Sequence, residues 1–170
     1  MKNINEKIKK IKILLTDVDG VLTDGGMYYS TSGDVMKKFH ARDGMGISLL
    51  KKNGIPTVIV TKEKTQMVKK WAKKMPVAKL YDGIIKKEEI LEKITKEFNV
   101  KPHEIAFIGD DVNDVNLLKV VGFSAMPNDG TKQLKKICDY QCHTSGGNGV
   151  LREISELIFE RKFHNKYKSY

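Results

Sequence analysis

Residues 11–25 read Ile-Lys-Ile-Leu-Leu-Thr-Asp-Val-Asp-Gly-Val-Leu-Thr-Asp-Gly, and this stretch decides the fold of the 170-residue chain. Residues 11–15 form a mostly apolar run with β-branched members, which is typical of a strand buried on both faces of a parallel sheet. Asp17 and Asp19 follow directly, at the position where open parallel sheets bind their ligands. Taken alone, these two acids and the glycine after them are equally compatible with a simple turn, because Asp and Gly favour turns.

The rest of the chain alternates apolar strands with helical segments. Further strands are expected at residues 57–60, 79–81, 104–108, 123–126 and 139–141, and helices at 41–53, 63–75, 86–98, 112–121, 130–137 and 150–159. This alternation predicts a single doubly wound α/β domain over residues 1–170, with three layers, a Rossmann-like topology and right-handed crossovers. The polar and aromatic tail at 161–170 has no periodicity and is expected to be flexible.

The segment at 25–40 predicts a β-hairpin, because two short β-prone runs flank the turn sequence Ser-Thr-Ser-Gly-Asp at 30–34. This hairpin leaves the first strand directly beside Asp17 and Asp19. We therefore expect it to form a flap over any site at those residues.

Composition narrows the possible partners. The chain carries 31 Lys+Arg against 21 Asp+Glu, a net charge of +10 that favours anionic partners, either nucleic acids or small phosphorylated acids. Its lysines are dispersed in pairs over expected helix surfaces. The chain lacks the interleaved aromatic residues and the arginine-rich arm of a nucleic-acid groove, so no nucleic-acid partner is expected.

Location and thiol chemistry follow from two further patterns. No apolar run approaches the roughly 18 residues of a membrane span, and residues 1–10 resemble a short basic helix rather than a signal peptide. We therefore expect a cytoplasmic protein with no membrane partner. Cys138 and Cys142 have too few neighbouring ligands for a metal site and are expected to be reduced structural thiols.

Three of the expected strands end in polar residues of a particular kind. The strand at 11–15 is followed by Asp17 and Asp19, and the strand at 57–60 is followed by Thr61. The strand at 104–108 is followed by Asp110, Asp111 and Asp114. Lys87 lies near the start of the helix that precedes this third strand. Clustered carboxylates repel one another unless a cation neutralises them, and Mg²⁺ suits carboxylate oxygens. A carboxylate can attack phosphorus, and a metal, a lysine and a hydroxyl stabilise charge on a transferred phosphoryl group.

On these residues the chain resembles the haloacid dehalogenase superfamily of phosphohydrolases. The family signature D-x-D-G-x-L/V-T/S matches residues 17–23, its strand-ending Thr or Ser matches Thr61, its lysine matches Lys87, and its G-D-D-x-x-D matches residues 109–114. Lys86 is a rival for the lysine role. Lys87 is preferred because the family lysine falls four residues after the glycine that corresponds to Gly83.

The resemblance implies a role for each of these side chains. Asp17 is expected to be the nucleophile and Asp19 the general acid and then the base, while Thr61 and Lys87 bind the phosphoryl group. Mg²⁺ is expected to be held by Asp17, the backbone carbonyl of Asp19, and Asp110. The carboxylates that support this metal shell are expected to be Asp111 and Asp114.

A narrower resemblance is to one capless branch, the tetrameric phosphatases of 3-deoxy-2-keto sugar acids. Further motifs of this branch match residues 39–47 (F-H-x-R-D-G-x-G-I) and 146–153 (G-G-x-G-x-x-R-E). The resemblance implies no cap domain, a homotetramer with the hairpins at its centre, and a neighbouring subunit over the site. By themselves, Arg42 and Asp43 could form a salt bridge at a helix start, and Gly146 and Gly147 a plain loop.

Two substrates of this branch are considered. Octulosonate 8-phosphate phosphatases commonly carry Gly-Arg after the Thr and a basic residue after D-G-x-G-I, where this chain has Lys62-Glu63 and Ser48. The pattern T-G-E-x-T of nonulosonate (sialic-acid-type) 9-phosphate phosphatases is closer to residues 61–65, although Lys62 departs from both. The nine-carbon substrate is therefore slightly preferred. The resemblance implies substrate contacts for Glu63, Lys74 and Arg42, and the contact of Lys74 is expected to cross a subunit interface.

Two other classes of function fit parts of the pattern. One is a catalytically silent module that tetramerises a sugar-acid cytidylyltransferase, and the other is a receiver-like phosphorylation switch. Asp17 and Asp19 argue against the silent module, which needs neither. Asp19 also argues against the switch, because a base that activates water shortens the life of an aspartyl-phosphate.

Overall fold

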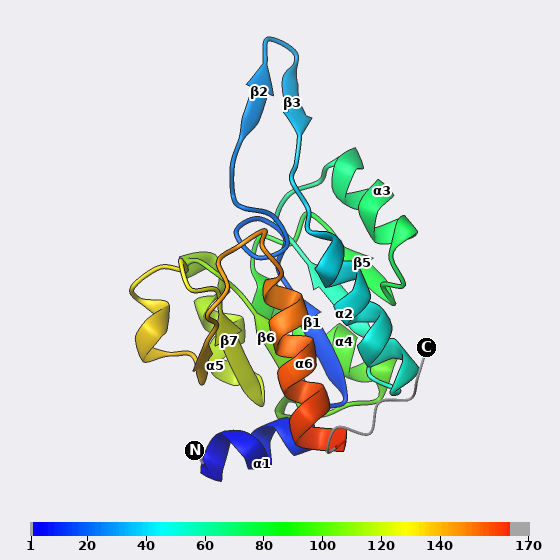
Figure 1. Ribbon diagram of the computed structural model, residues 1–170, viewed down its shortest axis with the longest axis vertical. Coiled ribbons are helices and arrows are strands. Elements are labelled where there is room, and N and C mark those ends of the chain that lie inside the picture. Colours follow the sequence, from blue (N-terminus) through cyan, green and yellow to red (C-terminus); the bar gives the residue numbers. More distant parts are fainter. Residues whose placement is uncertain (1, 164–170) are drawn as a thin grey trace.

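The computed structural model describes residues 2–163, which form a six-stranded parallel sheet with the strand order β5-β4-β1-β6-β7-β8. The strands are β1 (Ile13–Thr16), β4 (Thr57–Val60), β5 (Lys79–Tyr81), β6 (Ile105–Ile108), β7 (Phe123–Met126) and β8 (Tyr140–Gln141). β1 lies inside the sheet, where Leu14 is in register with Thr57 of β4 and Ala106 of β6. Because these strands are parallel, the residues that follow β1, β4 and β6 emerge at one edge, at the upper end of the sheet in Figure 1.

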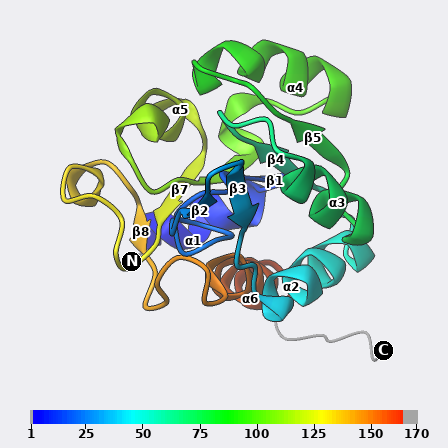
Figure 2. The same ribbon diagram turned by 90° about the horizontal axis from the view of Figure 1, so that it is seen from above.

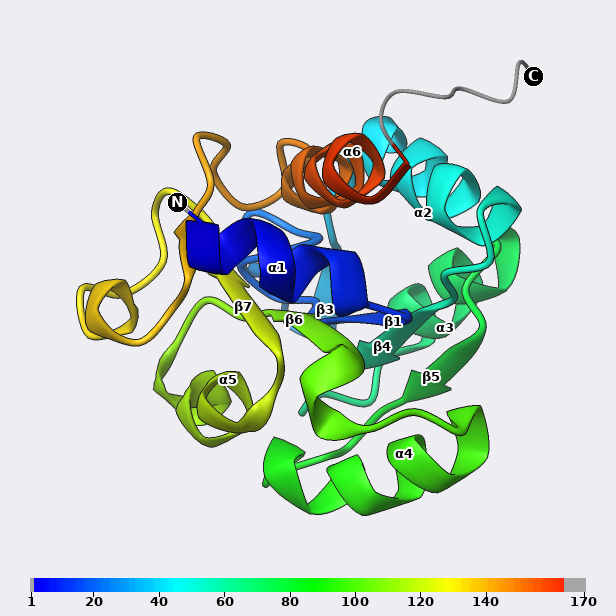
Figure 3. The same cartoon turned by 90° about the horizontal axis from the view of Figure 1, so that it is seen from below.

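Helices cover both faces of the sheet and complete the three layers that the alternating pattern predicts (Figure 3). One face carries α1 (Lys2–Lys10), α2 (Ala41–Lys52), α3 (Gln66–Lys74) and α6 (Val150–Phe163), and the other carries α4 (Leu91–Phe98) and α5 (Val115–Val120). Successive side chains of a strand point to opposite faces, so Leu14 packs in the first layer and Ile13 and Leu15 in the second. The doubly wound α/β fold is thus confirmed.

The hairpin of β2 (Tyr28–Ser30) and β3 (Gly33–Met36) projects from the carboxyl edge of the sheet and, seen from above, lies over it (Figures 1 and 2). Its turn at Thr31 and Ser32 is shorter than the five-residue turn expected from the sequence. Between β1 and β4 the described chain contains only this hairpin and α2, which confirms the absence of a cap domain.

Several boundaries differ from the sequence-based expectation. β1 begins at Ile13 rather than at residue 11, and α3 begins at Gln66 rather than near residue 63 because Thr65 caps it through a bond to the Val68 N–H. The helix expected at 86–98 starts as a 3-10 turn, Lys87–Ile90. The prediction of a full helix at 130–137 was wrong, because only the 3-10 turn Leu134–Lys136 forms there.

The C-terminal helix is longer than expected. α6 continues to Phe163, where the Phe163 ring contacts that of Phe159 and Lys162 donates to the backbone oxygen of Ile11 at 2.5 Å. The part of the predicted flexible tail at 161–163 is therefore helical, while residues 164–170 lie outside the described residues. Within the described range, no helix combines the length and the apolar character required to cross a membrane.

Candidate active site

The turn that follows β1 is a compact, hydrogen-bonded structure. The Val18 carbonyl accepts the N–H groups of Val21, Leu22 and Thr23 at 2.9–3.2 Å, and all four of these side chains are buried. Gly20 has φ 81°, and a Cβ at this position would stand 2.1 Å from Oδ2 of Asp110. The glycine is therefore required both by its backbone conformation and by the close approach of a site carboxylate.

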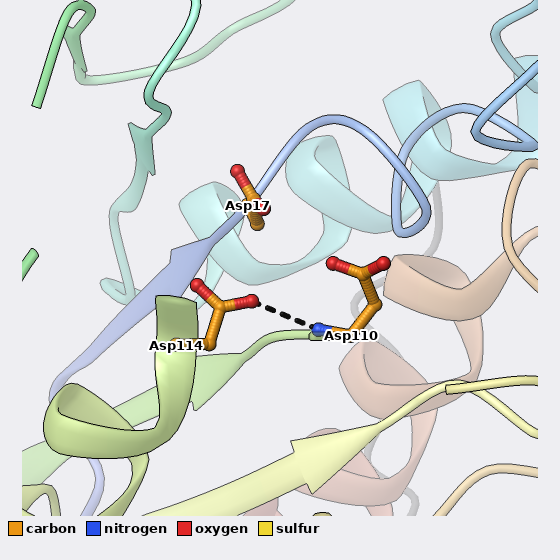
Figure 4. Close-up of side chains that lie close together, drawn as sticks. All are labelled: Asp17, Asp110 and Asp114. Carbon is orange, nitrogen blue, oxygen red and sulfur yellow. Dashed lines mark hydrogen bonds between the residues drawn. The ribbon is translucent and has the colours of Figure 1, made fainter. Parts of the chain in front are cut away.

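The loop after β6 brings two further carboxylates to the same edge (Figure 4). Oδ2 of Asp114 accepts the Asp110 N–H at 2.9 Å, which fixes the loop. Carboxylate oxygens of Asp17, Asp110 and Asp114 lie within 4.8 Å of one another. The expected convergence of Asp17 and Asp110 is thus present in the structure.

A buried lysine joins two of these carboxylates. Nζ of Lys87 lies 2.7 Å from Oδ2 of Asp17 and 2.6 Å from Oδ1 of Asp114, and its side chain is 0% exposed. Burial favours the neutral amine, but the two carboxylates outweigh it and raise the pKa of Lys87. The rival Lys86 pairs with Glu89 at 3.3 Å and is 66% exposed, so the geometry selects Lys87 as the lysine of the site.

Burial dominates the electrostatics of the carboxylates. It raises the pKa of Asp17 although Lys87 opposes the shift, and, together with the charges of Asp17 and Asp114, it raises the pKa of Asp110 to about 8. Among the described residues, Oδ1 of Asp17 is buried without a hydrogen-bond partner. Both oxygens of Asp114 accept hydrogen bonds, Oδ1 from Lys87 and Oδ2 from the Asp110 N–H. Asp17 and Asp110 keep oxygens without such a partner among the described residues, and the all-oxygen donor set of the three-carboxylate cluster fits Mg²⁺.

A cavity of about 230 Å³ opens above this cluster. Its lining residues are Asp17, Asp19, Gly20, Gly25, Thr61, Lys62, Glu63, Asp110, Asp111 and Asn113. Thr61 follows β4 and is anchored through its backbone N–H to Tyr81 at 2.9 Å. The cavity therefore presents five carboxylates and the Thr61 hydroxyl, while Lys87 lies fully buried behind Asp17.

The structure separates the candidate substrate residues. Glu63 lines the cavity, whereas Arg42 and Lys74 do not line it: Arg42 is exposed near the start of α2, and Lys74 is the last residue of α3. Asp111 lies at the rim and caps the Val112 N–H at 2.7 Å. Trp71 on α3 stacks on Phe39 with ring centroids 4.7 Å apart, which gives this side chain a packing role.

The motifs at residues 39–47 and 146–153 both lie beside the turn formed by residues 17–23. Asp43 makes no salt bridge with Arg42; it is buried, and its Oδ1 accepts the Arg152 N–H of α6 at 2.9 Å. The Gly147 N–H donates to the Val21 carbonyl at 3.0 Å, and a Cβ on Gly146 would stand 2.2 Å from the Gly20 oxygen. The glycines therefore brace the turn that carries Asp19.

Lys37 is a site residue that the sequence analysis missed. Its Nζ lies 2.6 Å from Oδ1 of Asp19 and 3.2 Å from Oε2 of Glu63. Nothing in its local pattern separates it from the other paired lysines, because the contact depends on where the base of the hairpin lies relative to the edge of the sheet.

Comparisons with known proteins agree with this geometry. Residues 61–154 match the haloacid dehalogenase-like hydrolases. The 3-deoxy-D-manno-octulosonate 8-phosphate phosphatase KdsC of Haemophilus influenzae is 31% identical over 157 residues, covering 92% of this chain and 87% of that protein. The enzyme of the same name from Escherichia coli strain K12 is 32% identical over 152 residues, covering 89% of this chain and 81% of its own length.

Solved structures show the same relationship. The Moraxella catarrhalis 3-deoxy-D-manno-octulosonate 8-phosphate phosphatase, in complex with magnesium ion, phosphate ion and KDO, superposes with a TM-score of 0.92 and 34% identity, covering 96% of this chain and 94% of that chain. The cobalt-bound Haemophilus influenzae phosphatase gives a TM-score of 0.89 and 31% identity, covering 92% of each chain. The fold and the site define a phosphoric monoester hydrolase. This chain belongs to the haloacid dehalogenase-like hydrolases.

Proposed function

We propose that this protein is a Mg²⁺-dependent phosphatase that hydrolyses the terminal phosphate of a 3-deoxy-2-keto sugar acid. The observation that carries the proposal is the buried Asp17 carboxylate, which has Lys87 bonded to one oxygen and the other oxygen without a partner among the described residues. An unpaired buried oxygen beside a lysine and a second carboxylate is suited to attack an electrophile that arrives with a cation. Similarity to magnesium- and cobalt-bound phosphatases supports the same chemistry.

The proposed reaction uses an aspartyl-phosphate. Asp17 attacks phosphorus, the bond from phosphorus to the sugar oxygen breaks, and Asp19 supplies the proton that the leaving alkoxide takes up. Asp19 then removes a proton from water, the water oxygen attacks phosphorus, and the bond to Asp17 breaks to release inorganic phosphate. Thr61 orients the phosphoryl group from the cavity wall, and Lys87, bonded to Asp17, balances its negative charge. Asp17, the Asp19 backbone carbonyl and Asp110 would hold Mg²⁺, which would neutralise part of the negative charge on the phosphoryl group and these carboxylates.

Two observations support different sugar acids. The names of the relatives support octulosonate 8-phosphate, which we take as the first candidate. The position of Glu63 in the cavity wall supports a nonulosonate 9-phosphate, because this carboxylate can accept a hydrogen bond from a substrate hydroxyl or amine.

The proposed assembly is a homotetramer built on the hairpin. Met27, Tyr29, Val35 and Met36 are all more than half exposed, and such a group of apolar side chains is typical of an interaction surface. In this assembly a neighbouring subunit covers the cavity, and Lys74 approaches the sugar acid of another subunit.

The test is a phosphate-release assay with both candidate acids, with Mg²⁺ and after its removal by EDTA. We expect turnover of at least one acid phosphate, loss of turnover with EDTA, and recovery when Mg²⁺ is restored. Glu63→Ala should lower kcat/KM for a nonulosonate 9-phosphate more than for octulosonate 8-phosphate if Glu63 reads the longer sugar. If the protein hydrolysed neither acid phosphate, the proposal would be contradicted and the silent tetramerisation module would be favoured.

A further inference from the structure

Lys37 is unusually buried for a lysine beside an exposed hairpin strand. It follows β3 directly, at the base of the hairpin, yet its side chain is only 9% exposed. Its Nζ bridges Asp19 from the β1 turn and Glu63 from the loop after β4. One ammonium therefore joins three segments that are far apart in the sequence.

Lys37 contacts two carboxylates of the cavity lining. Asp19 and Glu63 both line the cavity, whereas Lys37 is absent from the lining made by the described residues. This placement favours an action on the carboxylates over direct contact with a ligand.

The two donors to Asp19 select one of its oxygens. Lys37 donates to Oδ1 at 2.6 Å, and the Thr23 hydroxyl donates to the same atom at 3.3 Å. No other donor to Asp19 occurs among the described residues, so Oδ2 is the oxygen left for another hydrogen-bonding group. A carboxylate held in this way presents one defined oxygen to a reacting group.

We infer that Lys37 is a positioning residue for the acid–base carboxylate of Asp19, an inference that rests on the proposed phosphatase function. It holds Oδ1 so that Oδ2 meets the oxygen of the leaving group. A misplacement of about 1 Å in a catalytic group can cost about 10²-fold in rate, so a carboxylate free to rotate is a poorer proton donor. Lys37 also ties proton transfer to the hairpin, and hence to any subunit that packs against it.

The role can be separated from a structural one by the basicity of the leaving group. A strongly basic leaving oxygen needs a proton in the transition state, whereas a weakly basic one such as p-nitrophenolate departs without it. A variant that misplaces Asp19 should therefore lose activity on phenyl phosphate and keep it on p-nitrophenyl phosphate. Substituted phenyl phosphates share one shape and carry no sugar carboxylate, so the series also excludes an effect on sugar binding.

The experiment measures kcat/KM of the full chain with Mg²⁺ across such a series, because this constant reports formation of the aspartyl-phosphate. For Lys37→Met we expect a loss of about tenfold or more on phenyl phosphate and less than about threefold on p-nitrophenyl phosphate. Lys37→Arg should recover most of the loss. The matched control is Lys38→Met, which removes the exposed neighbouring lysine and should leave the series unchanged.

Three results would overturn the assignment. Equal losses of Lys37→Met across the whole series would indicate a purely structural role. An unchanged phenyl series with a raised KM for the sugar acid phosphate alone would make Lys37 a substrate ligand. A wild-type protein that hydrolyses no ester overturns the proposed function and this inference together, whereas wild-type turnover with equal losses overturns only the inference.

Discussion

The carboxyl edge of the sheet and the β2–β3 hairpin each supply a lysine to an aspartate of the cavity, but the two regions are built differently. At the sheet edge, Lys87 is fully buried between Asp17 and Asp114. In the hairpin, Lys37 lies on a segment whose apolar side chains are largely exposed, Met27 at 71% and Tyr29 at 62%. The first region is completed by its own chain, whereas the second presents a surface that suits a partner.

This difference assigns different roles to the sheet edge and to the hairpin of a domain without a cap. Strands β1, β4 and β6 are buried throughout, so the groups proposed to attack and bind phosphate have little freedom to move. The hairpin reaches the site through Lys37 at its base, while the side chains of its two strands are mostly exposed. We therefore expect substitutions at the sheet edge to affect chemistry and folding, and substitutions in the hairpin to affect assembly and the proton donor.

The largest expected effect comes from Asp17→Asn. Removal of the proposed nucleophile should lower phosphate release by about 10³-fold or more. Asp34→Asn, which removes a carboxylate from the exposed hairpin, is the matched control and should retain activity. Turnover of Asp17→Asn at the wild-type rate would exclude Asp17 as the nucleophile.

Replacement of the two bridging lysines compares the regions directly. Lys87→Met leaves two buried carboxylates without their cation and should lower the free energy of unfolding by about 3–5 kcal/mol. Lys37→Met breaks a partly exposed pair and should cost about 1 kcal/mol or less. Urea unfolding of both variants without Mg²⁺ measures the contrast, and equal losses would show that the hairpin base is as tightly integrated as the sheet edge.

The exposed side of the hairpin is probed by Val35→Glu. A charge in an apolar subunit interface should weaken self-association by about tenfold or more, while an exposed site should change the stability of the single chain by no more than about 0.5 kcal/mol. Sedimentation velocity measures the assembly, and Ser32→Glu at the hairpin turn serves as the control. A wild-type protein that sediments as a monomer would contradict the proposed tetramer.

A change in the pH dependence of stability, rather than in activity or assembly, is expected at Asp43 of α2, which accepts a hydrogen bond from α6. Burial raises its pKa from 3.8 to about 6, so between these values the folded state binds more protons than the unfolded state. The free energy of unfolding therefore decreases as pH rises through this window, by an amount on the order of 2 kcal/mol. Asp43→Asn should lack this component, and urea titrations from pH 4 to pH 7 with EDTA would show the difference. A parallel pH dependence in the two proteins would assign it to other groups.

Much of the site was predictable from the sequence because strand ends are local features. Asp17, Thr61 and Asp110 each follow an apolar run, and parallel strands bring such positions to one edge whatever the details of packing. The flanking helices were less predictable, since the weakly apolar segment at 130–137 becomes a single 3-10 turn. Leu134 packs into the core from this turn.

The sequence by itself determined the parallel α/β sheet, the absence of a cap and the set of residues at its edge, because hydrophobic periodicity and strand-end residues encode these features locally. Only the tertiary structure decided that Lys87 rather than Lys86 is buried against Asp17, that Asp43 caps α6, and that Lys37 reaches Asp19. Each of these contacts joins residues at least 18 positions apart, and for Asp43 and Arg152 the separation is 109. Contacts of this range depend on how layers and hairpin pack together, which no local pattern records.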